Sequence, residues 1–410
     1  MSVESLKCKE CKAEYELGAT YFCERCFGPL EIGYDHSDLD AAAAKRRIQA
    51  GSRGIWRYAD FLPFTGRPAD PLEPGLTPLL KADRLAERLG VAAEIWIKND
   101  AANPTHSFKD RVVAVAIAKA QELGFTTVAC ASTGNLANAV AAHAAAAGLD
   151  SYVFVPANLE EQKLLATGVY GTNLVGVRGN YDDVNRLCTQ LAETHPWAFV
   201  NVNLRPYYAE GSKTLAFETV EQLGWKLPDR VVSPIASGSL FTKLGRGFQE
   251  WIDLGLVEGG QPTFNGAQAT GCSPVATAFA EGWDVCKPQK PDTIAKSLAI
   301  GDPADGPYAV EHARKTGGGI DAVTDQEIRE AIKLLAETTG IFTETAGGVT
   351  IGVLRKLAER GKLAAGERVV AYITGEGLKT LDATRDTFSM HEIDPSLDSF
   401  DAEFAQEVSV

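Results

Sequence analysis

Short apolar runs alternate with longer segments of mixed polarity along most of the chain. The run "AEIWIKND" (93–100) precedes segment 107–124, and "TTVACAST" (126–133) precedes segment 135–148. Each longer segment repeats its apolar residues at helical spacing and ends in glycine, as a helix does. The short runs are apolar at successive positions, which is typical of strands buried on both faces. The pattern therefore predicts strands that alternate with helices.

The same alternation continues toward the C-terminus. Further strands are predicted at 151–157, 172–179, 198–202, 230–238 and 368–375, and further helices at 158–168, 181–195 and 211–224. Strands joined by helical crossovers form parallel or mixed sheets that are covered by helices. We therefore predict an α/β fold. In such folds ligands bind where strands end and helices begin, so these junctions are the places to search for a site.

Three segments lie outside this alternation. Residues 38–51 read as a short helix, and residues 57–80 as an extended, proline-rich arm. The chain after Thr384 is acidic, and we expect it to wrap around the body or to fray.

Length and charge exclude some classes of partner. With 410 residues the chain has room for two or three domains. Its formal net charge of -14 argues against nucleic acid or an anionic membrane as the main partner. The N-terminus lacks the apolar core of a signal peptide, and no stretch reaches the ~20 apolar residues of a membrane helix. We expect a soluble, cytoplasmic protein, although the charge says little about its substrate.

Eight cysteines divide into two groups. Four are scattered among apolar neighbours and are expected to be packing residues. The other four form "CKEC" and "CERC", separated by 11 residues: Cys8, Cys11, Cys23 and Cys26. Two such pairs can close a tetrahedron of thiolates around a structural zinc ion, and so small a segment needs a staple. We predict a zinc-ribbon-like segment; a degenerate ribbon and a redox pair are the alternatives.

Lys109 stands in "NPTHSFKDR" (103–111), at the start of a predicted helix. Ser107 and Asp110 have the spacing of a capping box. The positive end of the helix dipole and nearby Arg111 would both favour a neutral amine, which Schiff-base chemistry requires. The stretch alone leaves a solvated surface lysine as the alternative.

Three further junctions carry unusual residues. The loop "STGN" (132–135) can bind a carboxylate through its backbone amides, although an ordinary helix cap is as good an interpretation. A cup of small residues at 236–239 precedes a helix and suits a phosphate monoester. In "YITGEGLKT" (372–380), Thr374 follows the last strand, and its hydroxyl can hydrogen-bond a heterocyclic nitrogen.

Together these junctions resemble those of the fold type II pyridoxal-phosphate enzymes, and among them most closely the threonine synthases. The resemblance covers roughly residues 70 to 385. It is carried by "NPTHSFKDR", "CASTGNLANAVAAHAA", "EGSKTLAFE", "AIGDP" and "TGEGLKT". The N-terminal ribbon is also similar to that of some threonine synthases.

The resemblance implies a role for each matching residue. Lys109 would form the Schiff base with pyridoxal 5'-phosphate, Asn135 would hydrogen-bond its 3-hydroxyl, and Thr374 would contact its pyridine nitrogen. The cofactor's phosphate would bind to residues 236–240: Ala236, Ser237, Gly238, Ser239 and Leu240. The substrate would bind to the asparagine loop and to cations nearby: Ser132, Thr133, Gly134, Asn135, Arg205 and Lys213.

The resemblance also implies a domain organisation. Residues 36–105 and 225–385 would form the large cofactor domain, and residues 106–224 a small α/β domain. The zinc-ribbon-like segment would be 1–35, and 386–410 the acidic tail. We expect a homodimer.

Three positions depart from the family's pattern. His106 replaces a glycine before the lysine, and the phosphate cup lacks the usual G-N-x-G-N. Tyr208 stands where an arginine usually grips the substrate's phosphate; Arg205 or Lys213 would have to compensate.

The activity implied is that of a carbon–oxygen lyase that converts O-phospho-L-homoserine and water to L-threonine and phosphate. The departure at Tyr208 keeps a related enzyme open, one that performs β-replacement or β-elimination on O-phosphoserine or a similar amino acid (cysteate-synthase-like or serine/threonine dehydratase-like). A catalytically inactive binding protein is a third hypothesis, against which the intact Lys109, Asn135 and Thr374 argue.

Overall fold

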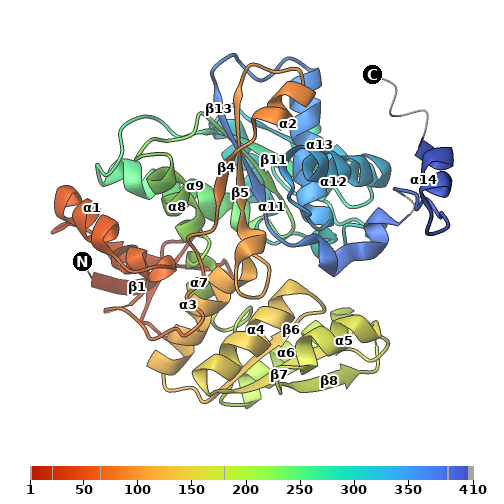
Figure 1. Ribbon diagram of the computed structural model, residues 1–410. Helices are drawn as coiled ribbons and strands as arrows, with labels where there is room; N and C mark the ends of the chain where they lie inside the picture. The colour runs from red at the N-terminus through yellow and green to blue at the C-terminus, as the bar shows by residue number, and fades with distance from the viewer. Residues whose placement is uncertain (1, 21, 65, 180, 386, 405–410) are drawn as a thin grey trace.

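The computed structural model describes residues 2–20, 22–64, 66–179, 181–385 and 387–404. Its strands form three sheets, and helices cover the two larger ones (Figure 1). The α/β fold predicted from the alternating pattern is thereby confirmed. No helix in the described part of the chain is long and apolar enough to cross a bilayer.

The largest sheet has six strands in the order β12-β11-β10-β13-β5-β4. Five of them are parallel, and β4 pairs antiparallel to β5 at the edge. Its strands are β4 (Leu79–Lys81), β5 (Glu94–Asn99), β10 (Arg230–Pro234), β11 (Thr263–Ala269), β12 (Gly319–Val323) and β13 (Arg368–Ile373).

Helices cover both faces of this sheet. The helices that belong with it are α2 (Asp83–Arg88), α8 (Lys213–Gln222), α9 (Ser239–Asp253), α10 (Pro274–Ala280), α11 (Gly306–Lys315), α12 (Asp325–Thr339) and α13 (Thr345–Glu359). Along β13, Val369 and Ala371 pack with α12 and α13, whereas Val370 and Tyr372 pack with α8, α9 and α11. This alternation explains why the strand has no charged residue from Val369 to Ile373, because both of its faces are buried there.

The second sheet has four parallel strands in the order β8-β7-β6-β9. They are β6 (Thr127–Ala131), β7 (Asp150–Pro156), β8 (Asn173–Val177) and β9 (Ala198–Phe199). Its helices are α3 (Lys109–Glu122), α4 (Asn135–Ala147), α5 (Glu161–Gly168) and α6 (Tyr181–Thr194), and the short helix α7 (Arg205–Glu210) follows β9. Val128 and Cys130 pack with α3 and α4, and Ala129 and Ala131 with α6.

The N-terminal segment forms a third, antiparallel sheet of β1 (Ser2–Cys8), β2 (Glu14–Tyr15) and β3 (Leu30–Asp35). It lies against α7 and α9 through hydrogen bonds and ion pairs. The Tyr34 hydroxyl donates to Glu210 at 2.7 Å, and Glu31 pairs with Lys243 at 3.5 Å. The predicted helix at 38–51 is present as α1 (Ala41–Ala50).

The arm at 57–80 is less extended than predicted. Its start belongs to a 3-10 helix, η1 (Ile55–Phe61), and its end to the edge strand β4. The burial of Tyr58 and Phe61 among aromatic rings explains why this part of the arm folds onto the body. Other short 3-10 helices are η2 (Asp100–Ala102), η3 (Lys296–Leu298) and η4 (Gly377–Thr384).

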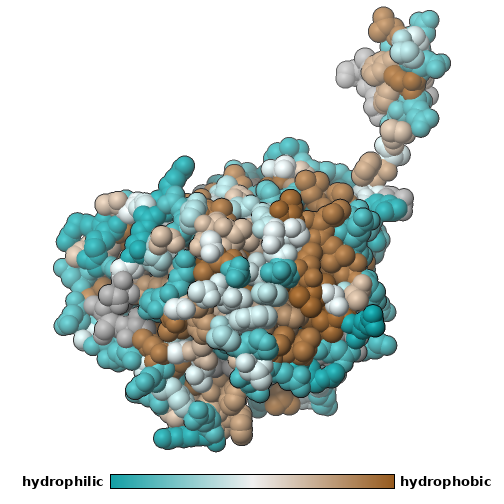
Figure 2. All heavy atoms as spheres, turned by 90° about the horizontal axis from the view of Figure 1, so that it is seen from below, coloured by the Kyte–Doolittle hydropathy of each residue, from teal (hydrophilic) through white to brown (hydrophobic). Residues whose placement is uncertain are grey.

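The described part of the acidic tail projects from the body and contains α14 (Leu397–Phe404) (Figures 1 and 2). Its Leu397 and Met390 side chains are exposed. It does not wrap around the body, one of the two arrangements that we expected. The division of the chain into the predicted domains stays a prediction.

Candidate active site

The loop that leads to Lys109 is fastened to the end of the neighbouring strand β13. The Phe108 N–H donates to the Thr374 carbonyl at 2.9 Å, and Ser107 forms an isolated β-bridge with Gly375. Because β5 and β13 are parallel, their carboxyl ends meet at one edge of the sheet. This register brings Lys109 and Thr374, two predicted site residues, into one place.

His106 adopts a left-handed backbone conformation, with φ of 63°. Glycine occupies such conformations without a steric penalty, whereas other residues are strained by roughly 1–2 kcal/mol. This accounts for the usual glycine in the family that the sequence resembles. In this chain a histidine adopts the left-handed conformation instead.

The capping box predicted from Ser107 and Asp110 is wrong. Helix α3 has Phe108 at its N-cap position and no side-chain cap. The Asp110 carboxylate instead accepts hydrogen bonds from the amide and the hydroxyl of Thr105, both at 2.9 Å, and lies 3.0 Å from His143 Nε2. The acid therefore braces the loop before the lysine.

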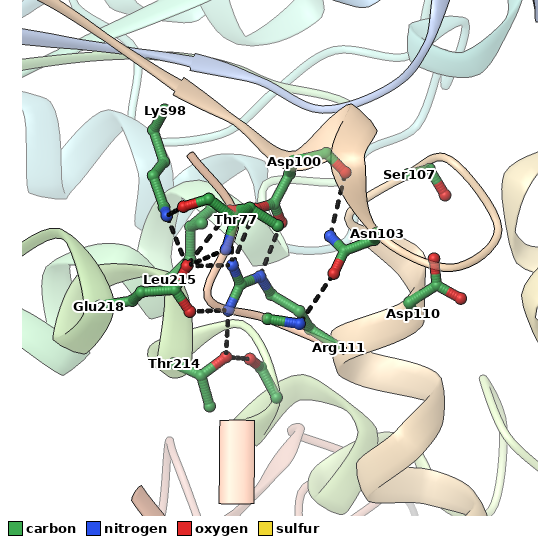
Figure 3. A network of polar contacts seen from close by, with 12 residues as sticks. Thr77, Lys98, Asp100, Asn103, Ser107, Asp110, Arg111, Thr214, Leu215 and Glu218 are labelled. Atoms are coloured by element: carbon green, nitrogen blue, oxygen red, sulfur yellow. Dashed lines mark hydrogen bonds and ion pairs between the residues drawn. The ribbon is translucent and has the colours of Figure 1, made fainter. Parts of the chain in front are cut away.

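Arg111 points into a buried ionic network beside the start of α3 (Figure 3). Its guanidinium donates to Asp100 at 2.7 and 2.8 Å and to Glu218 at 2.8 and 2.9 Å. Lys98 pairs with the same Glu218, so two cations face two carboxylates. The charge of Arg111 is already balanced, which removes our reason for expecting it to act on Lys109. The network instead fastens α3 to α8 and to the end of β5.

The Lys109 amine contacts a tyrosine. Its Nζ donates to the Tyr208 hydroxyl at 2.9 Å, and it lies 4.9 Å from the centre of the Phe108 ring. Lys109 is half-buried, and Tyr208 on α7 is 9% exposed. The tyrosine that replaces the family's arginine therefore lies at the lysine itself.

Asn135 is the first residue of α4, which follows β6, and it bridges two charged side chains. Its amide nitrogen donates to the Glu344 carboxylate at 3.0 and 3.2 Å, and its oxygen accepts from Lys379 at 2.8 Å. Burial raises the pKa of Glu344 and lowers the pKa of Lys379. The predicted loop residues Ser132, Thr133 and Gly134 lead into this position.

Residues 236–238 lie in the turn between β10 and α9, and Ser239 and Leu240 begin α9. Gly238 has φ of 97°, and a Cβ there would approach the backbone of Asp305 to 2.7 Å, so only glycine fits. The N-cap Gly238 offers no side-chain cap, and the Ser239 amide makes only a long 3.5 Å hydrogen bond to Ser237 Oγ, so the first amides of α9 can turn to an anion. The turn therefore has the form of a phosphate cup.

The two cations predicted to bind the substrate's phosphate, Arg205 and Lys213, lie in different surroundings. Arg205 is partly exposed and pairs with Asp305 at 2.7 Å, beside the cup. Lys213 is fully buried, and its Nζ lies 2.7 Å from both Glu210 and Glu250. The expectation that Lys213 grips the substrate is corrected, because its ammonium is enclosed by two carboxylates in the core.

The site contains charged residues that we did not predict. Glu344 lies in "FTETAGG", where no spacing marks it, and it is recognisable only by its position against Gly375 in the structure. Lys379 lies in "TGEGLKT" (374–380), where the family resemblance implies no role for it. Its Nζ also donates to the Thr105 carbonyl at 2.6 Å, which ties η4 to the lysine loop.

The four N-terminal cysteines gather at one point of the ribbon. Their sulfur atoms all lie within 4.8 Å of one another, with Cys8–Cys26 and Cys11–Cys23 both at 3.5 Å. A tetrahedral zinc site with Zn–S bonds of about 2.3 Å has S–S edges of about 3.8 Å. The cluster therefore fits such an ion.

The family model described as "Pyridoxal-phosphate dependent enzyme" matches residues 71–375. This chain belongs to that family. The threonine synthase of Methanocaldococcus jannaschii is 37% identical over 380 residues, covering 92% of this chain and 93% of that protein. The threonine synthase of Methanosarcina acetivorans is 38% identical over 377 residues, covering 91% and 92%. The suspected resemblance is confirmed.

Solved structures support the fold alone. Threonine deaminase isoform 2 from Solanum lycopersicum matches with a TM-score of 0.66 and 20% identity, covering 87% of this chain and 95% of that one. Maize serine racemase matches with a TM-score of 0.64 and 17% identity, covering 90% and 96%.

The residues present fit pyridoxal phosphate. A lysine amine is available for the aldehyde, and the uncapped amides of α9 are available for the phosphate. At Gly238 the backbone of Asp305 leaves no room for a side chain, so the chain turns tightly at the place proposed for the phosphate.

Proposed function

We propose that this protein is a pyridoxal-phosphate-dependent threonine synthase, a carbon–oxygen lyase that converts O-phospho-L-homoserine and water to L-threonine and phosphate. The observation that carries the proposal is the convergence of Lys109 and Thr374, at the edge of the six-stranded sheet, with Asn135, which follows a strand of the second sheet. The chain is also 37–38% identical to threonine synthases over most of its length. This would place the enzyme in threonine biosynthesis.

We propose that Lys109 holds the cofactor covalently, Asn135 contacts its 3-hydroxyl, and Thr374 its pyridine nitrogen. Residues 236–240 would hold its phosphate at the start of α9. When bound, the cofactor withdraws electrons from the substrate carbons that lose protons. A neutral hydroxyl at the pyridine nitrogen makes it a weaker electron sink than an acid would.

Lys109 would also act as the base that takes the substrate's α-proton and returns protons to later positions. This requires the amine to be free to move once substrate has displaced it from the cofactor. The substrate's carboxylate would bind to the amides of 132–135 at the start of α4.

Arg205 is our candidate for the substrate's phosphate. It is partly exposed, and its partner Asp305 is held beside the cup by a 2.8 Å hydrogen bond to the Ser237 carbonyl. A phosphate would have to replace Asp305 as the partner of the guanidinium. Bidentate contact with a guanidinium is the geometry that a phosphate prefers.

Because Tyr208 stands where the family has an arginine for the substrate's phosphate, a second candidate function stays open. That candidate is an enzyme acting on O-phosphoserine. One assay separates the two. Purified holoenzyme is incubated with O-phospho-L-homoserine, O-phospho-L-serine or L-homoserine, and phosphate and amino-acid products are measured. The proposal predicts equal amounts of phosphate and threonine from phosphohomoserine alone. Phosphate release from phosphoserine alone would favour the second candidate.

We further propose that Cys8, Cys11, Cys23 and Cys26 bind one structural Zn²⁺, supported by the close approach of their sulfur atoms. All four positions would be filled by protein, so the ion would stabilise the ribbon and take no part in catalysis. A cytoplasmic homodimer remains our expectation, which light scattering and cell fractionation can check.

A further inference from the structure

The two adjacent tyrosines of α7 point to different partners. The Tyr207 hydroxyl donates to the Gly18 carbonyl of the ribbon at 3.2 Å. The Tyr208 hydroxyl accepts from Lys109 Nζ at 2.9 Å. One helix therefore presents one phenol to a structural segment and the next to the reactive amine.

Helix α7 is held firmly enough to fix the position of Tyr208. Its Glu210 accepts from Tyr34 at 2.7 Å and from Lys243 at 2.7 Å, and Lys213 lies 2.7 Å from the same carboxylate. Burial alone would raise the pKa of Glu210, but the charges of Lys213 and Lys243 hold it well below the usual range. A charged, fully bonded anchor at the end of the helix restrains the phenol two residues earlier.

We propose that Tyr208 positions the Lys109 amine and acts as its hydrogen-bond partner during the reaction. The inference rests on the proposed function, because it concerns the nitrogen that would carry the cofactor. While that nitrogen carries a proton, its N–H donates to the phenol oxygen. When the amine is neutral, the phenol O–H donates to its lone pair. The phenol keeps its own proton throughout, so no further acid or base is required.

Two other charged groups belong to the same site. Glu344, the N-cap residue of α13, is close enough for Lys109 to influence its pKa, and Lys379 of η4 is joined to Glu344 through Asn135. Both are engaged with Asn135, whereas Tyr208 contacts Nζ directly. The Tyr208 hydroxyl is thus the group whose hydrogen bond can fix the orientation of Lys109 Nζ.

The test compares Tyr208→Phe with the matched control Tyr207→Phe. Both variants keep the aromatic ring and its packing, and each removes a single hydroxyl. We expect Tyr208→Phe to bind cofactor as wild type does but to lower kcat by about 10- to 100-fold, with KM changed by less than about threefold. The pH midpoint at which the Schiff-base absorption band titrates should be about one unit lower in Tyr208→Phe than in wild type. The reason is that the protonated nitrogen has lost its hydrogen-bond acceptor. Tyr207→Phe should match wild type in kcat and in the spectral titration.

Thermal melting of both holoenzymes checks that neither substitution destabilises the folded protein. If Tyr208→Phe retains the wild-type spectral titration and kcat, the inference is wrong even though the proposed function stands. If Tyr207→Phe shifts the titration equally, the effect belongs to the packing of α7, and the inference is also wrong. If wild type shows no Schiff-base band, the proposed function fails first.

Discussion

Replacing Glu218 by glutamine should destabilise the protein strongly, because this carboxylate is the junction of the network in Figure 3. It accepts from Lys98 and Arg111 and from the backbone amides of Leu76 and Thr77, both at 2.8 Å. The glutamine keeps the shape but removes the charge, and its NH₂ must face donors. Two buried cations would then share one carboxylate, that of Asp100.

Breaking a buried ion pair by removing one partner costs about 3–5 kcal/mol. At roughly 2–4 °C per kcal/mol for a domain of this size, the melting temperature should fall by about 10 °C. Differential scanning fluorimetry at pH 7 measures the shift. As a control, Glu311→Gln removes an exposed partner of Lys315 and should cost at most ~0.5 kcal/mol.

A double variant isolates the electrostatic cause. Adding Lys98→Met to Glu218→Gln removes the excess cation and leaves Arg111 paired with Asp100. The second substitution should therefore cost less in the Glu218→Gln background than alone, with a coupling of roughly 1–3 kcal/mol. Strict additivity of the two changes would contradict the reasoning, as would a Glu218→Gln variant as stable as wild type.

The same residue gives a pH dependence with a definite sign. Burial would raise the pKa of Glu218, but Arg111 and Lys98 together hold it well below its ordinary value of 4.5. A carboxyl group with a lowered folded pKa stabilises the protein fully above its unfolded pKa and less as pH falls through the folded one. The stability gap between wild type and Glu218→Gln should therefore be widest near neutral pH and narrow below about pH 4.5.

Three further variants test the site and the ribbon. The double variant Cys8→Ser, Cys11→Ser should lose about one zinc ion per chain by elemental analysis while keeping the cofactor band; zinc-free wild type would refute this. Lys109→Ala should lose turnover yet retain cofactor noncovalently, by absorbance after desalting; residual wild-type turnover would exclude the lysine. Arg205→Ala should raise KM for phosphohomoserine by roughly 30-fold or more without altering the cofactor spectrum, and normal kinetics would remove it from the substrate site.

Local sequence patterns were sufficient to predict the sheets and the strand ends at which Lys109 and Thr374 lie. The apolar runs at 93–100 and 368–375 are strands because both faces are buried, and their parallel register then brings Lys109 to Thr374. The small residues at 236–239 indicated a tight turn into a helix, and the structure places Gly238 there in a left-handed conformation.

The missed features depend on contacts between distant segments. Asp110 has the spacing of a capping residue, but a histidine 33 positions later competes for it. Lys213 matches a family pattern, yet Glu250 on another helix encloses its ammonium. Neither partner is marked by spacing along the chain, because ion pairs form wherever folding brings charges together.

Reduction of the holoenzyme with borohydride, followed by peptide mass spectrometry, tests the central claim most directly. Reduction fixes the cofactor to whichever lysine carries it. The account predicts the pyridoxyl group on Lys109, in the peptide that contains "THSFK". Attachment to Lys379, the other lysine at this site, or the absence of any modified lysine would contradict it.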